Sequence, residues 1–280
     1  MDDNSAFSSS AVSSSAVSSS ASEFAGLSVQ NLSFAYPGRE TVFEALGFEV
    51  APGRILGLAG ANGSGKSTLL DLLAGILTPT GGGIRLAGQE GTKSLRSLSA
   101  LLPQNVDHWL LGETPREDLE LAFGFYGSDK SVQGDRLTAG AEYWGLGEIL
   151  DDPVDALSIG QKKRLALASA LAGEPTLVLL DEPFAGLDWP ACQALLKDLT
   201  RLPQSGAVVV IATHEPELVK KHVDDWLLLK PGAHLFGPPA RTLSRLAEFG
   251  ARPVQSSPHN AADDSGWDEP VETDRLNWDD

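Results

Sequence analysis

The stretch Gly60-Ala61-Asn62-Gly63-Ser64-Gly65-Lys66-Ser67 decides the fold of this chain. It follows the apolar run 55–59 and precedes residues 68–73, which have helical periodicity. A G-x-x-x-x-G-K-S phosphate-binding loop requires this strand–loop–helix context. Its glycines let consecutive backbone N–H groups turn inward at the positive end of the following helix, forming a concave anion site. The sequence therefore predicts a site for a nucleoside triphosphate.

Side chains in and beyond this loop indicate what happens to the phosphates. Lys66 is expected to reach the β- and γ-phosphates, and the Ser67 hydroxyl to bind Mg²⁺. The apolar run 177–180 ends in two carboxylates, Asp181 and Glu182. At the end of a parallel strand Asp181 can hold Mg²⁺ through its water shell, while Glu182 can orient or deprotonate the attacking water. The alternative is that the acidic pair only opens a turn before Pro183.

A second motif, Leu157-Ser158-Ile159-Gly160-Gln161, directly precedes an Ala/Leu-rich helical segment with a basic first turn. Cations at a helix N-terminus oppose the helix dipole. We therefore expect Lys162, Lys163 and Arg164 to face an anion, such as a phosphate from another molecule. The motif is short, but its place before the strand that ends in Asp181 strengthens it.

A histidine, His214, follows the apolar and β-branched segment 207–213. Taken alone, a histidine after a strand is more often a cap or a core residue than a catalyst. Because this segment comes next in sequence after the strand that carries Glu182, its end is expected near the γ-phosphate.

Together these motifs resemble the ATP-binding cassette (ABC) ATPase family over about residues 27–238. The resemblance implies ATP and Mg²⁺ as cofactors, with Glu182 as the catalytic base and His214 as a sensor of the γ-phosphate. It implies that Gln104 belongs to the Q-loop, which contacts Mg²⁺, as do Ser67 and Asp181. The nucleotide-binding residues that it implies are Tyr36, Gly60, Asn62, Gly63, Ser64, Gly65, Lys66, Ser67, Thr68, Ser158, Gly160, Gln161 and Asp188. For Tyr36, which the family stacks on adenine, the residues alone would favour core packing.

The resemblance also implies a two-subunit enzyme, a homodimer or a heterodimer. In that family the phosphate-binding loop of one chain and the signature motif of the other meet the same ATP, so ATP binding closes the dimer and hydrolysis opens it. Ile159 departs from the family pattern, which has glycine there. A β-branched residue would be strained at positive φ and harmless at an ordinary helix start. We expect a working signature because Ser158, Gly160 and Gln161 are retained.

The segment Gln104–Leu119 points to one branch of the family. It is similar to the segment after the Q-loop in cobalt-type and energy-coupling-factor (ECF) importer ATPases, and Phe184–Asp188 also fits that group. Trp109 replaces that group's glutamine. The apolar residues 109–111 either pack under the helical subdomain or dock amphipathic helices of a transmembrane subunit near Gln104–Leu111. The resemblance favours docking and implies import of metal ions or vitamins.

Composition bounds the partners and the location. The formal net charge of −17 argues against a nucleic-acid surface, which would show clustered Lys and Arg. With Cys192 as its only cysteine, the chain has no disulfide framework, which fits the cytoplasm. No apolar run approaches the roughly 20 residues of a membrane-spanning helix. We therefore expect a peripheral subunit at the cytoplasmic face of the cell membrane.

The predicted fold class is α/β, a P-loop NTPase of the ABC ATPase type. A parallel core sheet is expected from strands near 55–59, 98–102, 177–181, 208–213 and 225–229, with an edge strand near 234–236 and a final helix over 239–249. An antiparallel β-subdomain is expected over 27–49, and a helical subdomain is inserted at about 105–160. The ATPase domain is expected to cover residues 26–250. The Ser-rich leader 1–25 and the acidic tail 251–280 are expected to be disordered because they bury too little apolar surface.

Other functions stay open on the sequence alone. Export rather than import is opposed only by the segment after Gln104. A soluble ABC protein acting on ribosomes or DNA usually carries two fused cassettes or a coiled-coil insertion, which this sequence lacks. A partner ATPase of impaired activity, marked by Ile159, is the third alternative.

Overall fold

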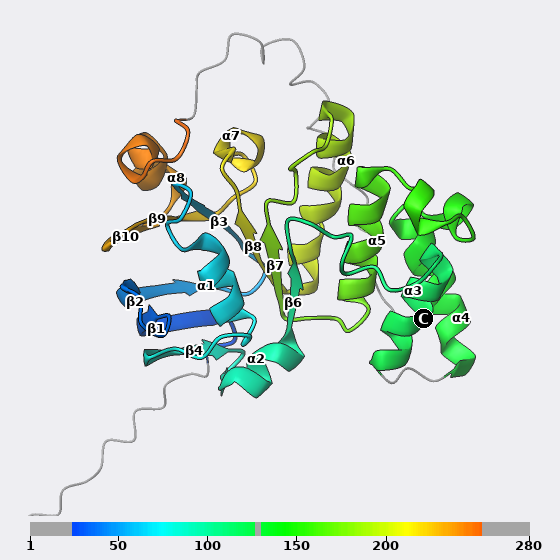
Figure 1. Cartoon of the computed structure of the whole chain (residues 1–280), viewed down its shortest axis with the longest axis horizontal. Coiled ribbons are helices and arrows are strands. Elements are labelled where there is room, and N and C mark those ends of the chain that lie inside the picture. The colour runs from blue at the N-terminus through cyan, green and yellow to red at the C-terminus, as the bar shows by residue number, and fades with distance from the viewer. Residues whose placement is uncertain (1–23, 127–129, 254–280) are drawn as a thin grey trace, which may run out of the picture.

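The apolar runs of the sequence form the centre of a six-stranded sheet in the computed structural model, which describes residues 24–126 and 130–253 (Figure 1). All neighbouring pairs in this sheet are parallel except the edge strand β10, which pairs antiparallel with β9. The predicted core strands and edge strand are therefore confirmed. The order across the sheet is β10 (Ala233–Gly237), β9 (Asp225–Lys230), β3 (Ile55–Gly60), β8 (Val208–Ala212), β7 (Leu177–Asp181) and β6 (Ser99–Leu102).

A second, four-stranded antiparallel sheet packs over one face of the first. Its order is β2 (Thr41–Val50), β1 (Leu27–Ala35), β4 (Gly81–Leu86) and β5 (Gln89–Glu90). The alternation over 27–49 predicted β1 and β2, whereas the later strands β4 and β5 complete the sheet from beyond the phosphate-binding loop. Helix α1 (Lys66–Leu73) buries four leucines between the two sheets. Burying one such side chain contributes about 1.5–3 kcal/mol, so this layer firmly positions the loop that precedes α1.

Helices cover the opposite face of the six-stranded sheet and form a second core. Strand β7 contributes to both cores. Leu177 and Leu179 pack into the core between the two sheets, whereas Val178 and Leu180 pack into the core under the helices. The predicted helical insertion contains α3 (Pro115–Phe125), α4 (Lys130–Tyr143) and the 3-10 turns Gly147–Ile149 and Val154–Ala156. It leads into α5 (Ile159–Leu171), and α6 (Trp189–Leu199) follows β7.

Short elements complete the described chain. They are α2 (Thr92–Leu98), a 3-10 turn at Leu202–Ser205, α7 (Pro216–Val219) and α8 (Pro239–Thr242). The single final helix predicted over 239–249 is wrong in detail: α8 stops at Thr242, and a 3-10 segment, Leu243–Phe249, follows. Gly250, which directly follows this segment, has a φ of 69°. The leader 1–25 and the tail 251–280, which were expected to be disordered, lie outside the described ranges except for residues 24–25 and 251–253, of which Ala251 is buried.

Candidate nucleotide-binding site

The phosphate-binding loop joins β3 to α1 and depends on its glycines. Gly65, the residue before α1, has a φ of 97°, and a Cβ there would lie 2.8 Å from the side chains of Val42 and Phe43. A Cβ at Gly60 would lie 2.2 Å from the carbonyl oxygen of Leu229. Side chains at either position would therefore displace the loop from the strands around it.

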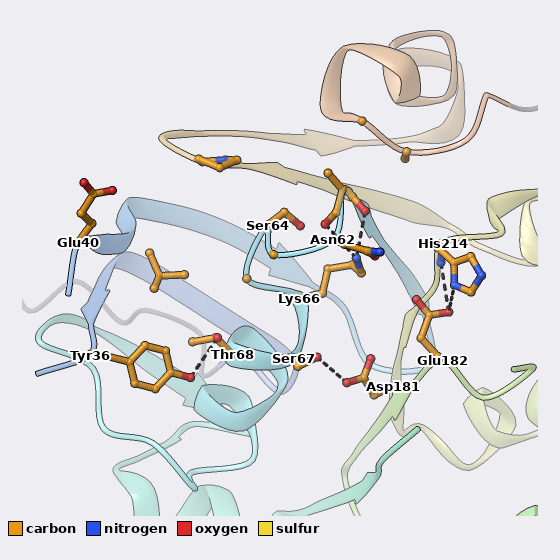
Figure 2. A pocket seen from close by; sticks show the side chains of 18 of the residues that line it. Tyr36, Glu40, Asn62, Ser64, Lys66, Ser67, Thr68, Asp181, Glu182 and His214 are labelled. Carbon is orange, nitrogen blue, oxygen red and sulfur yellow. Dashed lines mark hydrogen bonds and ion pairs between the residues drawn. The ribbon is translucent and has the colours of Figure 1, made fainter. Parts of the chain in front are cut away.

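The loop forms one wall of a cavity of about 1230 Å³ (Figure 2). The elements around the cavity come from both sheets, because Tyr36 follows β1 and Asp181 ends β7. Gln104, Glu182 and His214 lie at the carboxyl ends of the parallel strands, where ligands of open α/β sheets bind. The sequence-predicted residues that line this cavity are Tyr36, Gly60, Asn62, Gly63, Ser64, Gly65, Lys66, Ser67, Thr68, Gln104, Asp181, Glu182 and His214.

Polar groups on the floor of the cavity are held by the chain itself. The buried Lys66 ammonium donates hydrogen bonds to the carbonyl oxygens of Gly60, at 3.0 Å, and Ala61, at 3.2 Å. The Ser67 hydroxyl donates to Asp181 Oδ2 at 2.6 Å. Burial, and secondarily the nearby Asp181 carboxylate, raises the pKa of Asp71 above its ordinary value. The cavity floor thus holds the Lys66 ammonium group together with the hard oxygen atoms of Ser67 and Asp181.

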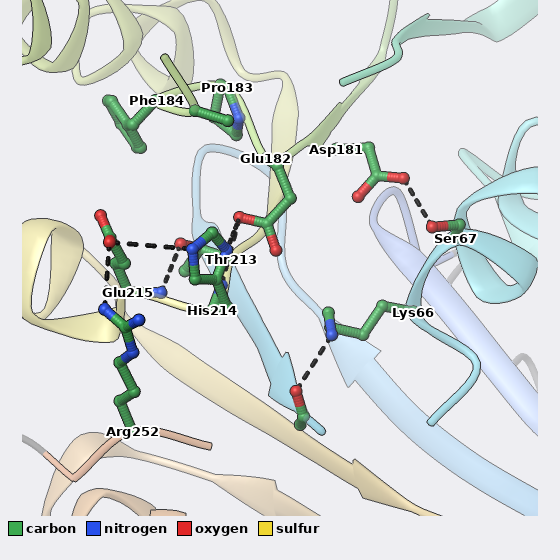
Figure 3. A network of polar contacts seen from close by, with 12 residues as sticks. Lys66, Ser67, Asp181, Glu182, Pro183, Phe184, Thr213, His214, Glu215 and Arg252 are labelled. Carbon is green, nitrogen blue, oxygen red and sulfur yellow. Dashed lines mark hydrogen bonds and ion pairs between the residues drawn. The ribbon is translucent and has the colours of Figure 1, made fainter. Parts of the chain in front are cut away.

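A chain of polar contacts between side chains leads away from the end of β7 (Figure 3). Glu182 has a φ of 49°, and its Oε2 lies 2.7 Å from Nδ1 of His214 and accepts the His214 backbone N–H at 3.2 Å. Nε2 of His214 is 3.7 Å from Glu215, which also pairs with Arg252 at 3.3 Å. A non-glycine residue at positive φ costs on the order of 1 kcal/mol or more, and such residues concentrate at functional sites.

Tyr36 borders the cavity and also packs against the core between the two sheets. Its hydroxyl is 3.2 Å from Thr68 Oγ1, and the edge of its ring contacts Phe34 with centroids 4.9 Å apart. Its side chain is half-buried and borders the cavity. The ring face is thus oriented by two contacts and can receive a planar group.

The signature residues do not reach this cavity. Ser158 caps α5 through a capping box, in which its hydroxyl accepts the Gln161 N–H at 3.2 Å and the Gln161 side chain accepts the Ser158 N–H at 2.8 Å. Asp188 caps α6 by accepting the Ala191 N–H at 2.9 Å. With Gly160, these residues border a separate hollow of about 340 Å³ between α5 and α6.

Ile159 occupies an ordinary helical position. It is the first residue of α5 and is not among the described non-glycine residues at positive φ. Of the two alternatives for this position, the structure therefore shows the harmless one. Its side chain is 53% exposed, close to the signature residues.

Within this chain, the expectation that the basic first turn of α5 faces an anion is wrong for Lys163, whereas Lys162 and Arg164 lie beside carboxylates. Lys162 pairs with Asp107 at 3.0 Å, and Arg164 lies 3.7 Å from Asp198. Lys163 is 2% exposed and donates to backbone carbonyl oxygens instead. The sequence pattern could not show this, because these partners come from distant parts of the chain.

The loop after Gln104 exposes part of its apolar segment. Trp109 is 47% and Leu111 is 78% exposed, whereas Leu110 packs against the helical core. The buried carboxylate of Asp118 accepts the Leu111 N–H at 2.7 Å and the Ser169 hydroxyl at 2.7 Å. These bonds fasten the exposed loop to α3 and α5.

Several cavity residues were missed by the sequence analysis. Residues 38–42 border it, and a signal existed, since they directly follow Tyr36. Arg252 also borders the cavity, and the chain near it contacts the phosphate-binding loop through the Ala61 N–H, which donates to the Phe249 carbonyl oxygen at 3.0 Å. Nothing in the local sequence of Arg252 indicates this position.

Comparison with known proteins agrees with this geometry. A family model described as ABC transporter matches residues 43–185, and one described as an AAA domain matches residues 151–220. The fold and the cavity define an ATP-binding protein of the P-loop class. The chain belongs to the ABC transporter family, as its ATP-binding ATPase component.

Relatives of similar length carry more specific names. An ABC transporter ATP-binding protein of Streptomyces coelicolor is 36% identical over 78% of this chain and 79% of its own length. The cobalt import ATP-binding protein CbiO of Rhodobacter capsulatus is 34% identical over 81% of this chain and 85% of its own. The energy-coupling factor transporter ATP-binding protein EcfA of Methanocaldococcus jannaschii is 34% identical over 74% of this chain and 76% of its own length.

The chain also resembles solved structures. That of CbiO1 from Clostridium perfringens, described as part of the ABC transporter complex CbiONQ, has a TM-score of 0.71 and 29% identity, over 78% of this chain and 90% of that one. Some other relatives are longer, and the chain spans only 35–37% of their length.

Proposed function

We propose that this chain is the ATP-hydrolysing subunit of an ECF or cobalt-type importer of metal ions or vitamins. The observation that carries the proposal is the convergence of the phosphate-binding loop, Asp181, Glu182 and His214 on one cavity. The similarity to EcfA and CbiO, over most of each chain, supports the importer branch. The sequence of the Gln104–Leu119 segment points the same way.

ATP would enter with its phosphates on the loop and its base beside Tyr36. The buried hydroxyl oxygen of Ser64 has no hydrogen-bond partner within the described residues, so the loop retains an unused polar atom next to the anion site. Lys66 would exchange its two carbonyl partners for phosphate oxygens, which bind a cation more strongly. Backbone N–H groups at the start of α1 complete the anion site.

The donor set fits Mg²⁺. The Ser67 hydroxyl oxygen lies 2.6 Å from a carboxylate oxygen of Asp181, and both atoms are hard ligands. Gln104 borders the same cavity. Mg²⁺ usually takes one or two protein oxygen atoms together with phosphates and water, so no larger cluster of carboxylates is needed. When bound, the ion supplies positive charge that stabilises the phosphoryl group during transfer.

The remaining residues would handle the attacking water. Glu182 would accept a proton from it, and His214 would contact the γ-phosphate. In the structure these two side chains hydrogen-bond to each other, which keeps both at the cavity wall. The insertion of ATP and water would break this bond and turn each group to its own partner.

A second ATPase chain would complete each site. The signature residues Ser158, Gly160 and Gln161 border a different hollow from the loop, so they would contact a nucleotide held by another subunit. ATP binding would then join two chains, as either a homodimer or a heterodimer, and hydrolysis would release them. This cycle supplies the mechanical step of transport.

A separate transmembrane subunit would carry the solute. None of the helices within residues 24–126 and 130–253 has the length and apolar character needed to cross a bilayer. Trp109 and Leu111 offer an exposed apolar surface, fastened to the helical layer through Asp118. We assign this surface to docking at the cytoplasmic face of the membrane.

Affinity purification from detergent-solubilised native membranes tests the proposal. We expect a small integral subunit and a separate solute-binding membrane protein to be retained and identified by mass spectrometry. Recovery of one large permease would contradict the importer branch while leaving a transport ATPase. Recovery of soluble partners alone would contradict transport.

A further inference from the structure

A buried lysine connects the helix of the signature motif to the segment that carries Glu182. Lys163 lies on α5 and is 2% exposed. Its ammonium group donates to the carbonyl oxygens of Pro183, at 2.6 Å, and Ala185, at 2.7 Å, and is 3.5 Å from that of Glu182. One side chain therefore contacts the carbonyl oxygens of three residues in the turn that follows β7.

This turn is irregular and requires support. Glu182 has a φ of 49° and Gly186 a φ of 77°, so the chain reverses sharply between β7 and α6. Within the turn, the Ala185 N–H donates to the Glu182 carbonyl oxygen at 3.1 Å. A backbone held at positive φ persists only where its surroundings fix it. The Lys163 ammonium group supplies such support from outside the turn.

Within the part of the chain that the structure describes, no carboxylate forms an ion pair with Lys163. The charged or titratable groups near it are the Glu182 carboxylate, which bonds to His214, and the Cys192 thiol on α6. Burial lowers the pKa of Lys163 to about 8, and burial raises that of Cys192. Burying an ammonium group without a counter-ion is costly unless its hydrogen bonds are satisfied, and here carbonyl oxygens satisfy them.

We propose that Lys163 is a positioning residue that fixes the backbone of Glu182–Ala185 relative to α5. The inference rests on the proposed role of Glu182 as the base, and it adds a physical connection between α5 and the Glu182 backbone. Because α5 begins with the signature residues, a shift of this helix on dimer closure would reach Glu182 through one side chain. Closure and the placement of the base would thus be coupled within a single chain.

Substitutions that keep the size of Lys163 test this proposal in the purified transporter complex. Lys163→Met removes every donor, and we expect kcat to fall by about 10-fold or more while the affinity for a non-hydrolysable ATP analogue changes by less than about 2-fold. Lys163→Gln retains an amide donor and is expected to recover several-fold of that loss. Lys197→Met, at an exposed position on α6, is the matched control and should behave as the wild-type complex does.

Two outcomes would overturn the proposal. One is a Lys163→Met complex with wild-type kcat. The other is a parallel loss of kcat and analogue affinity without recovery in Lys163→Gln, which indicates a purely structural role. If Lys163→Met does not fold, amide hydrogen exchange in Lys163→Gln tests the proposal instead. The amides of segment 182–187 should exchange faster than in the wild type, whereas those of α1 should exchange at the wild-type rate. Exchange of segment 182–187 at the wild-type rate would contradict the positioning role of Lys163. A wild-type complex that does not hydrolyse ATP would instead contradict the proposed function.

Discussion

Glu182 and His214 show how individual residues prepare this site. The Glu182 carboxylate accepts the backbone N–H of His214, and the same carboxylate oxygen lies 2.7 Å from the Nδ1 atom of the histidine ring. A strained backbone at Glu182 aims its side chain away from Asp181, although the two are adjacent in sequence. The proposed division of labour, metal binding by Asp181 and proton transfer by Glu182, follows from this divergence.

Tyr36 provides a prediction at the residue scale. Base–aromatic stacking contributes about 1–3 kcal/mol, so Tyr36→Ala should weaken ATP binding by about 10-fold. Tyr36→Phe keeps the ring and loses only the contact to Thr68, and its affinity should stay close to that of the wild type. Titration with a fluorescent ATP analogue measures both. Equal affinity in Tyr36→Ala would show that the ring packs without stacking.

The sequence was informative for residues whose roles depend on local context. The loop glycines, Lys66 and Ser67 are adjacent in the chain, so a pattern reveals them. Lys163 and Arg252 have roles defined by carbonyl oxygens and a carboxylate far away in the chain, and charge alone suggested a wrong environment for Lys163. Local patterns cannot predict such partners.

At the scale of elements, α5 joins three parts of the molecule. Its N-terminus carries the signature residues, Lys163 contacts the turn after β7, and Ser169 bonds to Asp118 beneath the exposed loop. The core strands were predicted closely because continuous apolar runs bounded by turn residues leave little freedom. The segment 239–249 was predicted less well, because it consists of α8 and a 3-10 segment instead of one helix.

The pH dependence of stability follows from this helix. Folding lowers the pKa of Lys163 from 10.5 to about 8, so between these values the unfolded chain holds a proton that the folded chain has lost. The contribution of this group to stability therefore rises with pH across that window and is constant below it. Urea unfolding of the wild type and of Lys163→Met at several pH values measures the difference. A wild-type advantage that does not grow with rising pH would contradict the burial of a titrating lysine.

At the scale of the whole molecule, the two hollows support the proposal that a second chain completes each site. The loop cavity and the signature hollow are bordered by different elements. The exposed Trp109 and Leu111 form a third surface, to which we assign docking. The family resemblance already implied that the two sets of residues meet only between chains, and the structure shows that they border separate hollows within one chain.

Docking gives a prediction at this scale. Trp109→Ser combined with Leu111→Ser should abolish retention of the transmembrane subunit on affinity purification, because an apolar contact is removed. ATP-analogue affinity should be unchanged, since neither residue borders the loop cavity. Ile76→Ser, at an apolar position that is 51% exposed elsewhere, is the control. Undiminished retention by the double variant would place the docking surface on other residues.

The most direct measurement is the response of Glu182→Gln to ATP. Removing the base should lower hydrolysis by about 100-fold or more while leaving nucleotide binding intact. Because ATP then persists, the variant should form a stable dimer in ATP and Mg²⁺ and stay monomeric without nucleotide, as measured by light scattering after gel filtration, with phosphate release followed in parallel. A variant that hydrolyses ATP at the wild-type rate, or that binds ATP and remains a monomer, would contradict the proposed mechanism.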